Sequence, residues 1–479
     1  MKIFNEYKKL DQTKKAMIWY TFSNVLIKSI ALLSTPIFTR LMTTNEFGKF
    51  TIFQSWLSIL IIITSLNMFQ GGYTKGLIVF EDDNNGFTSA SLGLVITVTF
   101  FWMIIYFCAY DFWNEFFELS PVLMIFMVLN LLFMPVLEFW SARLRFEYKY
   151  KEVVFISIVI SISSVLLGII LVMLNKNYRV EARALADLLA RLIICGLILI
   201  SIFRKGKIFY NKTYWRYNLS FNIPLLPHFL AFYVLNQSDR LMISKMIGNT
   251  QAAYYSVAYT ISMMMNLIMS ALNNALMPFI YKSINNGKNE DIRKGTAFIF
   301  ILMAMLCIVT MAFAPEIITI FAGKNYADAV YVVPPIAASV YFIFVYSMFS
   351  TIEYYYQKTV RIAVATSVSA IINIVLNYYL INIYGYYAAG YTTLISYMIL
   401  TVIHYLFYKV IIIDKFGKDV ELYNIRVIVV CSIFVLVTML FMIYIYKELL
   451  IRYSVILIIV LVCLFNSRKI KLLFSDLKR

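Results

Sequence analysis

The feature that most constrains this chain is a series of apolar stretches, each long enough to cross a lipid bilayer as a helix. A bilayer core about 30 Å thick needs about 20 apolar residues of helix. Of the 479 residues, 62% are apolar and 14% are charged, which excludes a water-soluble protein because no soluble core could hide so much apolar surface. We therefore predict an all-α integral membrane protein with fourteen transmembrane helices, at Ala16–Phe38, Phe50–Phe69, Thr88–Ala109, Pro121–Ala142, Val153–Leu174, Ala182–Phe203, Leu219–Asn236, Ala252–Asn274, Thr296–Phe313, Ala329–Thr351, Ile362–Ile383, Tyr386–Tyr408, Val427–Tyr446 and Leu449–Phe465.

Lys and Arg are unevenly divided between the two sides of these helices. With the N-terminus in the cytoplasm, 30 of the 42 Lys and Arg residues lie on the cytoplasmic side, 9 lie in outer loops and three lie inside helices. Cytoplasmic loops of membrane proteins carry an excess of these residues. We therefore expect both termini to be cytoplasmic. Because every loop is short, function must lie between the helices or at their ends.

Several kinds of chemistry lack their usual sequence patterns. The five Cys show no paired spacing, and neither His belongs to an H-E-x-x-H pattern, so we predict no disulfide framework, no metal site and no cofactor. A phosphate-binding loop of the form G-x-x-x-x-G-K-[ST] does not occur. The net charge of +17 accompanies many aromatic and aliphatic residues, which favours a membrane over nucleic acid as the partner.

A short repeat relates the first and seventh predicted helices. Arg-Leu-Met ends the first helix at residues 40–42 and the seventh at residues 240–242, and a Gly follows each at positions 48 and 248. Helices six apart in an alternating series run in the same direction. The repeat therefore indicates two six-helix halves related by an axis along the membrane normal, although so short a match also arises by coincidence.

Longer motifs carry a resemblance to a family. The pattern P-x-x-x-R-L at 36–41, followed by E-F-G-x-F at 46–50, resembles the P-x-x-x-R-L and E-Y-G-x-Y signature of bacterial polysaccharide flippases. Pro224, Pro227 and D-R-L-M-I at 239–243 resemble its second-half signature, and the spaced residues of 316–329 and 385–390 match two later positions. The chain thus resembles the Wzx-type O-antigen and capsule flippases of the multidrug/oligosaccharidyl-lipid/polysaccharide exporter superfamily.

This resemblance implies a fold, a function and partners. It implies two six-helix lobes, at residues 1–215 and 216–410, in a V-shaped MATE-like arrangement, with two further helices and a basic tail at 411–479. The implied function is translocation of undecaprenyl-pyrophosphate-linked oligosaccharide across the bacterial cytoplasmic membrane by alternating access, for O-antigen lipopolysaccharide or capsule. Coupling to protons or sodium, and a polysaccharide polymerase and chain-length regulator as partners, are also implied.

Such a cargo requires cations within the membrane, because moving a phosphate charge through hydrocarbon is prohibitive. Lys28 lies in the middle of the first helix, where we expect a phosphate-binding side chain; the alternative is a structural hydrogen bond. Arg183, Asp187 and Arg191 are spaced i, i+4 and i+8, which places them on one face of the sixth helix. We expect the arginines to bind substrate with Asp187 as counter-ion; the alternative is an ion triad that fixes helix packing.

Two further groups are candidates. Four charged residues lie at the predicted outer ends of helices one and seven, where they either form a gate between the lobes or anchor the interface: Arg40, Asp239, Arg240 and Lys245. His228 follows two prolines, and broken helices often mark transport sites, although a lone His is often structural. Tyr255 and Tyr259 offer rings that stack on sugars or simply pack.

Two other classes of function were weighed. A cation-coupled multidrug exporter of the same superfamily needs membrane acids, but the two acids within the predicted helices both have Arg nearby. An enzyme is not expected: a polymerase needs a large outer loop, and an acyltransferase needs a His paired with an acid, whereas His404 has no acid close in sequence.

Overall fold

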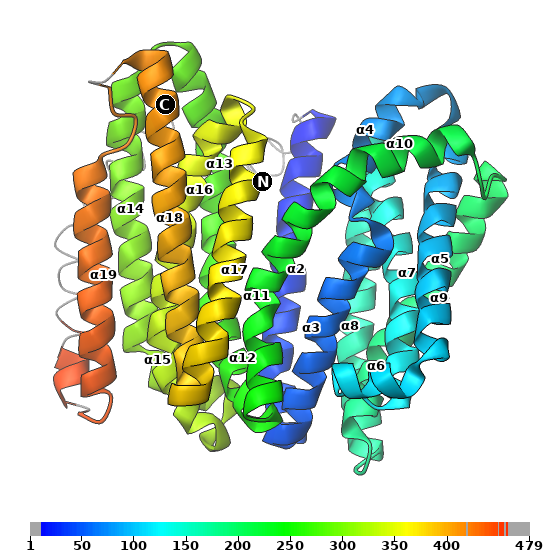
Figure 1. The fold of residues 1–479 in the computed structure, drawn as a ribbon, viewed down its shortest axis with the longest axis horizontal. Helices are drawn as coiled ribbons and strands as arrows, with labels where there is room; N and C mark the ends of the chain where they lie inside the picture. Colours follow the sequence, from blue (N-terminus) through cyan, green and yellow to red (C-terminus); the bar gives the residue numbers. More distant parts are fainter. Residues whose placement is uncertain (1–10, 418–419, 449, 455–456, 458–479) are drawn as a thin grey trace, which may run out of the picture. The chain divides into compact units, whose positions relative to one another are not determined.

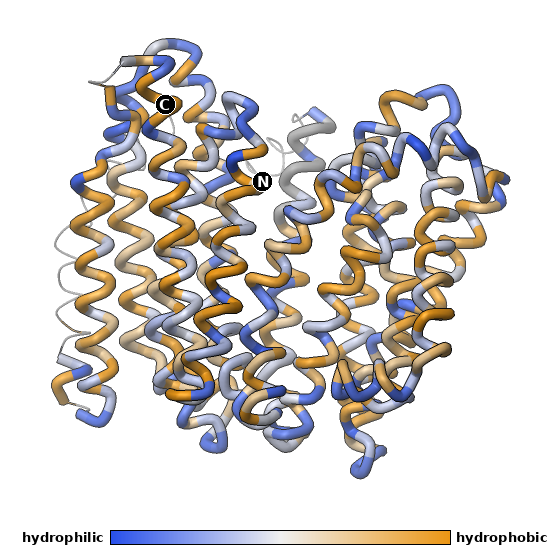
Figure 2. Tube along the Cα trace, viewed as in Figure 1, coloured by the Kyte–Doolittle hydropathy of each residue, from blue (hydrophilic) through white to orange (hydrophobic). Residues whose placement is uncertain are grey.

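The structure is a computed structural model that describes residues 11–417, 420–448, 450–454 and 457. Regular structure in this part of the chain is helical, with no strand (Figure 1). Thirteen helical stretches within it are long and apolar enough to cross a membrane, and each overlaps one of the first thirteen predicted segments. Apolar residues fill the middle of the helices and polar residues gather at their ends (Figure 2). The predicted all-α membrane fold is confirmed, and the fourteenth segment, Leu449–Phe465, lies largely outside the described residues.

Helix packing divides the chain into two compact units, residues 1–253 and residues 254–479. Within the first unit, α9 packs against α5, α7 and α8, α2 packs against α8, and α3 packs against α11. The elements of the first unit are α2 (Gln12–Leu41), α3 (Thr44–Ser65), η1 (Met68–Gln70), α4 (Gly72–Val79), η2 (Glu81–Asp83), α5 (Asn84–Cys108), α6 (Tyr110–Phe117), α7 (Pro121–Phe146), α8 (Tyr150–Leu174), α9 (Arg179–Gly206), α10 (Lys212–Asn222), η3 (Ile223–Leu225) and α11 (Leu226–Met246).

An aromatic core lies where α4, α5 and α7 of the first unit meet. Tyr73, Phe87 and Phe139 are fully buried there. The Tyr73 ring stacks on Phe87 with the ring centroids 5.7 Å apart, and its hydroxyl lies 2.7 Å from the Thr88 hydroxyl. The buried hydroxyl is thus satisfied, as burial of a polar group requires.

The second unit is built around α16, which packs against α14, α18 and α19. Its elements, the first of which crosses the boundary between the units, are α12 (Asn249–Met263), α13 (Met265–Asn285), α14 (Asn289–Ala312), α15 (Ala314–Ala322), η4 (Lys324–Val332), α16 (Val333–Tyr355), α17 (Thr359–Tyr384), α18 (Tyr387–Phe416) and α19 (Ile425–Ile445). The predicted lobes, 1–215 and 216–410, were drawn from helix number, whereas the units follow packing, and α11 joins the first unit through α3. The lobes stay a prediction.

The motif at residues 46–50 has a local structural cause. The Thr43 hydroxyl accepts a hydrogen bond from the Glu46 backbone N–H at 3.3 Å, and the Glu46 carboxylate accepts one from the Thr43 N–H at 2.7 Å. This reciprocal capping box satisfies two backbone donors that a helix start otherwise leaves unpaired. Glu46 also forms an ion pair with Arg179 at 3.3 Å, which ties the start of α3 to the start of α9.

Gly48 permits a close approach between α3 and the start of α12. A Cβ atom at this position would lie 1.9 Å from the backbone oxygen of Asn249. Gly48→Ala is therefore expected to lower the free energy of unfolding by about 1–3 kcal/mol, the usual cost of overpacking. Gly196→Ala in α9 is the matched control, because nothing lies within 4 Å of the added methyl. Denaturant titration measures the free energy of unfolding of the two purified variants. Equal values would contradict the inference that Gly48 is needed for the close approach of α3 to α12.

The seventh predicted segment is interrupted, as its prolines suggest. α10 ends at Asn222, the 3₁₀ turn η3 contains Pro224, and Pro227 lies in the first turn of α11. Proline is accommodated at a helix start because its missing N–H would be unpaired there anyway. The chain thus changes direction between α10 and α11.

Candidate functional site

One face of α9 lines a cavity inside the first unit. Arg183, Asp187 and Arg191 lie on this face, one turn apart, opposite residues of α2, α3 and α8. The cavity has a volume of about 290 Å³. We call it the α9 cavity, and its lining residues are Ile27, Ile30, Ala31, Ser34, Phe50, Gln54, Ile160, Ser161, Ser164, Val165, Arg183, Asp187 and Arg191.

Asp187 is the centre of the polar contacts in the α9 cavity. Its carboxylate accepts hydrogen bonds from the Arg183 guanidinium at 2.6 Å and from the Gln54 amide at 3.0 Å, and a further one from the Ser164 hydroxyl. Asp187 is 5% exposed and Arg183 is 7% exposed. Three donors on three helices therefore hold this buried carboxylate, so it is already neutralised and fully engaged.

Arg183 is fixed between aromatic rings as well as by its carboxylate. Its guanidinium carbon lies 4.3 Å from the Phe38 ring centroid and 5.0 Å from that of Phe50. Gly168 on α8 leaves room for this packing, because a Cβ there would come within 3.2 Å of the Arg183 side chain. Aromatic faces and a buried carboxylate together hold the arginine in one position.

Arg191 has different surroundings. Its guanidinium donates to the Asn130 side-chain oxygen at 3.0 Å and to the Asp187 backbone oxygen at 3.4 Å. Asn130 is buried and donates in turn to the Phe126 backbone oxygen. Among the described residues Arg191 forms no salt bridge with a carboxylate, although its charge acts on Asp187 one turn away. Sequence spacing left open which arginine Asp187 pairs with; the structure pairs it with Arg183, and the charges lining the cavity sum to one positive charge.

Lys28 is placed apart from this cluster. It is an exposed residue of α2, adjacent in sequence to Ile27, but it does not belong to the lining of the α9 cavity. In the described part of the chain it makes no hydrogen bond or ion pair. The structure therefore brings together three of the four membrane charges that the sequence singled out, and leaves Lys28 on a neighbouring face of α2.

The four residues of the predicted gate all lie in the first unit. The Arg40 guanidinium donates to the Pro36 backbone oxygen at 2.8 Å, and Arg240 donates to the Gln237 side chain at 2.5 Å. The Lys245 ammonium lies 5.4 Å from the centroid of the Phe116 ring, while Asp239 is fully buried. These are contacts within one unit, and a gating role for the four residues stays a prediction.

The remaining candidates lie in two separate places. His228 is half-buried in the first turn of α11, where its ring contacts Phe229 with centroids 5.6 Å apart. Tyr255 and Tyr259 lie on α12 with ring centroids 6.0 Å apart and are 0% and 8% exposed. The Tyr255 hydroxyl lies 3.3 Å from that of Thr393. Both rings are buried in this structure, and a sugar-binding role for them stays a prediction.

Sequence reasoning missed a buried acid–histidine pair in the second unit. Glu353 on α16 and His404 on α18 are both fully buried, and the carboxylate lies 2.6 Å from the imidazole Nδ1. The Tyr346 ring stacks on the imidazole with centroids 5.4 Å apart. The statement that His404 lacks an acid holds only along the sequence and is wrong in space, because the packing of α16 on α18 joins residues 51 apart.

The fold of the chain resembles the folds of known membrane transporters. The structure resembles that of the lipid II flippase MurJ, with a TM-score of 0.70 at 14% identity over 95% of this chain and all of that one. It also resembles an inward-facing multidrug resistance MATE family transporter of the MOP superfamily, with a TM-score of 0.65 at 13% identity over 81% of this chain and 95% of that one. The chain thus has the fold of this transporter superfamily.

Sequence comparison then gives the family. The model of the polysaccharide biosynthesis protein family matches residues 13–284, and the MatE model matches residues 224–379. Protein 1 of the Lsg locus of Haemophilus influenzae is 22% identical over 372 residues, which cover 75% of this chain and 88% of that protein. The chain belongs to the polysaccharide biosynthesis protein family, and the predicted resemblance to polysaccharide flippases of the MOP superfamily is confirmed.

Proposed function

We propose that this protein translocates undecaprenyl-pyrophosphate-linked oligosaccharide repeat units across the bacterial cytoplasmic membrane by alternating access. The product serves O-antigen lipopolysaccharide or capsule assembly, and both termini lie in the cytoplasm. Family membership supports a flippase-like transporter of polysaccharide biosynthesis.

The observation that carries this proposal is Arg191, a cation in the apolar helix α9 that forms no salt bridge with a carboxylate among the described residues. A cation inside a membrane helix costs about 2.5–3.5 kcal/mol on insertion scales, so its retention calls for a function. A pyrophosphate headgroup supplies the missing negative charge. Binding then offsets two costs together, because the buried cation gains a counter-ion and the dehydrated phosphate gains a charged hydrogen-bond donor.

The other lining residues suit a phosphate and its first sugar. Ser34, Gln54 and Ser161 place hydroxyl and amide groups on three walls of the cavity. The two hydroxyls now donate to the backbone oxygens of Ala31 and Ser157, and the Gln54 amide donates to Asp187. Rotation of the hydroxyls, and the second N–H of the amide, would supply hydrogen bonds to phosphate oxygens, which are the costliest atoms to dehydrate. Arg183 stays paired with Asp187 and keeps its position in the cavity lining. Arg191, on the same face of α9, binds the substrate. The prenyl tail needs no such path because it remains in lipid.

The second candidate function is cation-coupled multidrug export. The match to the MatE model and the resemblance to a MATE transporter structure support it. An exporter of cationic drugs needs an acid available in its site. Asp187, the acid of the α9 cavity, already accepts hydrogen bonds from three side chains. An anionic cargo therefore fits this cavity better. Coupling to protons or sodium, and cooperation with a polymerase and a chain-length regulator, belong to the proposal without a site in the structure assigned to them.

Arg191→Gln is expected to reduce surface polysaccharide strongly in cells that lack the chromosomal copy. Loss of one hydrogen bond to a charged group is worth about 1.5–3 kcal/mol, or about 10- to 150-fold in transport. Lys28→Gln tests the second predicted cation in the same way. Polysaccharide on intact cells is measured by immunoblot, and the amount of protein in the membrane is measured in parallel.

The matched control is Arg145→Gln, which removes one exposed arginine from the end of α7 in the same unit. It should leave polysaccharide unchanged. Arg191→Lys retains the charge and should restore part of the activity. Wild-type polysaccharide in both Arg191→Gln and Lys28→Gln, at normal protein amounts, would refute a cationic path.

A further inference from the structure

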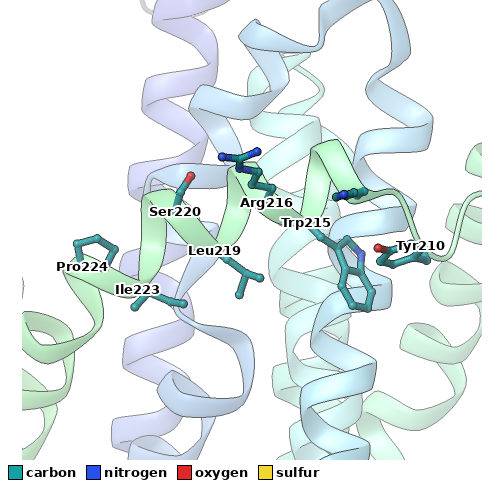
Figure 3. A pocket seen from close by; sticks show the side chains of 8 residues that line it. Tyr210, Trp215, Arg216, Leu219, Ser220, Ile223 and Pro224 are labelled. Carbon is teal, nitrogen blue, oxygen red and sulfur yellow. The ribbon is translucent and has the colours of Figure 1, made fainter.

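A second cavity lies along α10, outside the α9 cavity. Its volume is about 570 Å³ and it opens broadly to the surface. Two cations, Lys212 and Arg216, form part of its lining. The apolar part of the lining follows the same helix and continues into η3: Trp215, Leu219, Ile223 and Pro224. Figure 3 shows Arg216 and Ser220 on one side of α10, and Trp215, Leu219 and Ile223 projecting from the other.

α10 is held rigidly against α5 by side chains that face the unit. The Trp215 indole N–H donates to the Ala90 backbone oxygen at 2.8 Å, and the Asn218 amide donates to the Ser91 hydroxyl at 2.8 Å. The Tyr214 hydroxyl donates to Asp83 at 2.9 Å. These bonds fix the orientation of α10. Trp215 and Leu219 also pack against the core of the unit, and their exposed part lines the cavity. The cavity is therefore a preformed surface and not a gap that a mobile helix could close.

The charge of this segment is strongly one-sided. From residue 204 to residue 216 the chain carries five Lys and Arg residues and no Asp or Glu. Lys212 and Arg216 are exposed, and neither makes a hydrogen bond or ion pair within the described part of the chain. Charge asymmetry places this end of the unit at the cytoplasmic surface, where anionic lipids attract basic segments. Both cations are thus available to an anion at the depth of lipid headgroups.

We propose that the α10 cavity binds an anionic phospholipid of the cytoplasmic leaflet. Its phosphate contacts Lys212 and Arg216, and its glycerol and first acyl carbons lie on Trp215, Leu219 and Ile223. A helix with cations on one face and Trp and aliphatic residues on the other lies in the plane of the membrane interface in this way. The lipid would hold the connection between α9 and α11 at a constant depth.

The lining residues favour an anionic phospholipid over two related ligands, free phosphate and a lipid-linked oligosaccharide. Free phosphate would leave the apolar part of the cavity exposed to water, which costs free energy in proportion to its area. A lipid-linked oligosaccharide needs hydrogen-bonding groups for its sugars, but the uncharged polar residues of the lining, apart from the engaged Trp215 indole, are Tyr210 and Ser220. A phospholipid matches both halves of the surface. This inference does not depend on the proposed flippase activity.

The test is a lipid titration of the full-length protein, delipidated in detergent and analysed by native mass spectrometry. Phosphatidylglycerol and phosphatidylcholine with the same acyl chains are compared. Each cation near a headgroup is worth about 1 kcal/mol, or about fivefold in affinity. Lys212→Gln/Arg216→Gln should therefore weaken phosphatidylglycerol binding about 30-fold and phosphatidylcholine binding clearly less, because the choline cation already offsets the charge of that phosphate, whereas Leu219→Asn/Ile223→Asn should weaken both lipids to a similar extent.

A control variant removes the same charge elsewhere. Arg293→Gln/Lys294→Gln lies at the start of α14, where the two cations already pair with Glu421 and Glu290. It should keep wild-type lipid affinity. The proposal is overturned if this control loses as much affinity as the α10 variant, or if the α10 variant loses none. Displacement of phosphatidylglycerol by millimolar inorganic phosphate, or stronger binding of undecaprenyl phosphate at the same site, would show that the ligand was misidentified.

Discussion

Replacing Asp187 with alanine should lower the free energy of unfolding of the protein by about 3–5 kcal/mol, because it leaves Arg183 buried without its counter-ion. Arg183 is 7% exposed and cannot reach water without leaving the Phe38 and Phe50 rings. Gln54 and Ser164 would also lose their acceptor. Unfolding of the purified protein in mixed micelles, followed by circular dichroism, measures the loss.

Two variants separate the ion pair from its packing. Asp187→Asn keeps the volume and part of the hydrogen bonding, so its cost should be smaller than that of alanine. Arg183→Ala/Asp187→Ala removes both charges, and its cost should be clearly less than the sum of the single changes, because contacting residues couple. A free energy for Asp187→Ala within about 0.5 kcal/mol of wild type, the range of neutral surface changes, would show that the pair is not structural.

Glu353→Ala should also lower the free energy of unfolding, through a contact in the second unit. Removing the carboxylate leaves the His404 imidazole fully buried, with its Nδ1 deprived of a partner at 2.6 Å. Leaving a buried hydrogen-bonding group without its partner typically costs about 1–3 kcal/mol, and more where the group is charged. Expression in membranes and the midpoint of unfolding both report this loss.

The control for Glu353 retains a hydrogen-bond acceptor. Glu353→Gln keeps a side-chain amide beside Nδ1 that can accept or donate a hydrogen bond, so it should cost less than Glu353→Ala. Glu353→Ala/His404→Ala should recover much of the loss of the single variant. If Glu353→Ala and Glu353→Gln unfold at the same denaturant concentration as wild type, the contact between α16 and α18 does not depend on this pair.

Hydropathy predicted the helices well because membrane insertion leaves a strong local signal. A span must satisfy its own backbone hydrogen bonds and be apolar for about 20 residues, so it is visible without knowledge of its neighbours. The interruption near Pro224 was visible for the same local reason. Assignment of α11 to the first unit was not, because it depends on packing against α3, a helix far away in the sequence.

The candidate site was predictable along one helix and not between helices. Spacing of i, i+4 and i+8 suffices to put Arg183, Asp187 and Arg191 on one face of α9. Their partners Gln54, Ser164 and Asn130 come from three other helices, and no local sequence pattern predicts these contacts. For Lys28 the sequence predicted the position halfway along the first helix. It did not predict the rotation of α2, which keeps Lys28 out of the lining of the α9 cavity.

The central claim is that a lipid-linked oligosaccharide crosses the membrane by way of the cationic α9 cavity. The most direct measurement reconstitutes the full-length protein into vesicles that contain labelled undecaprenyl-pyrophosphate-linked oligosaccharide. It follows how fast the sugars of the inner leaflet become accessible to a membrane-impermeant reagent. We predict that wild type and Arg145→Gln accelerate this exposure equally over protein-free vesicles, and that Arg191→Gln reduces the acceleration about 10- to 150-fold. Exposure no faster with wild-type protein than in protein-free vesicles would contradict the account.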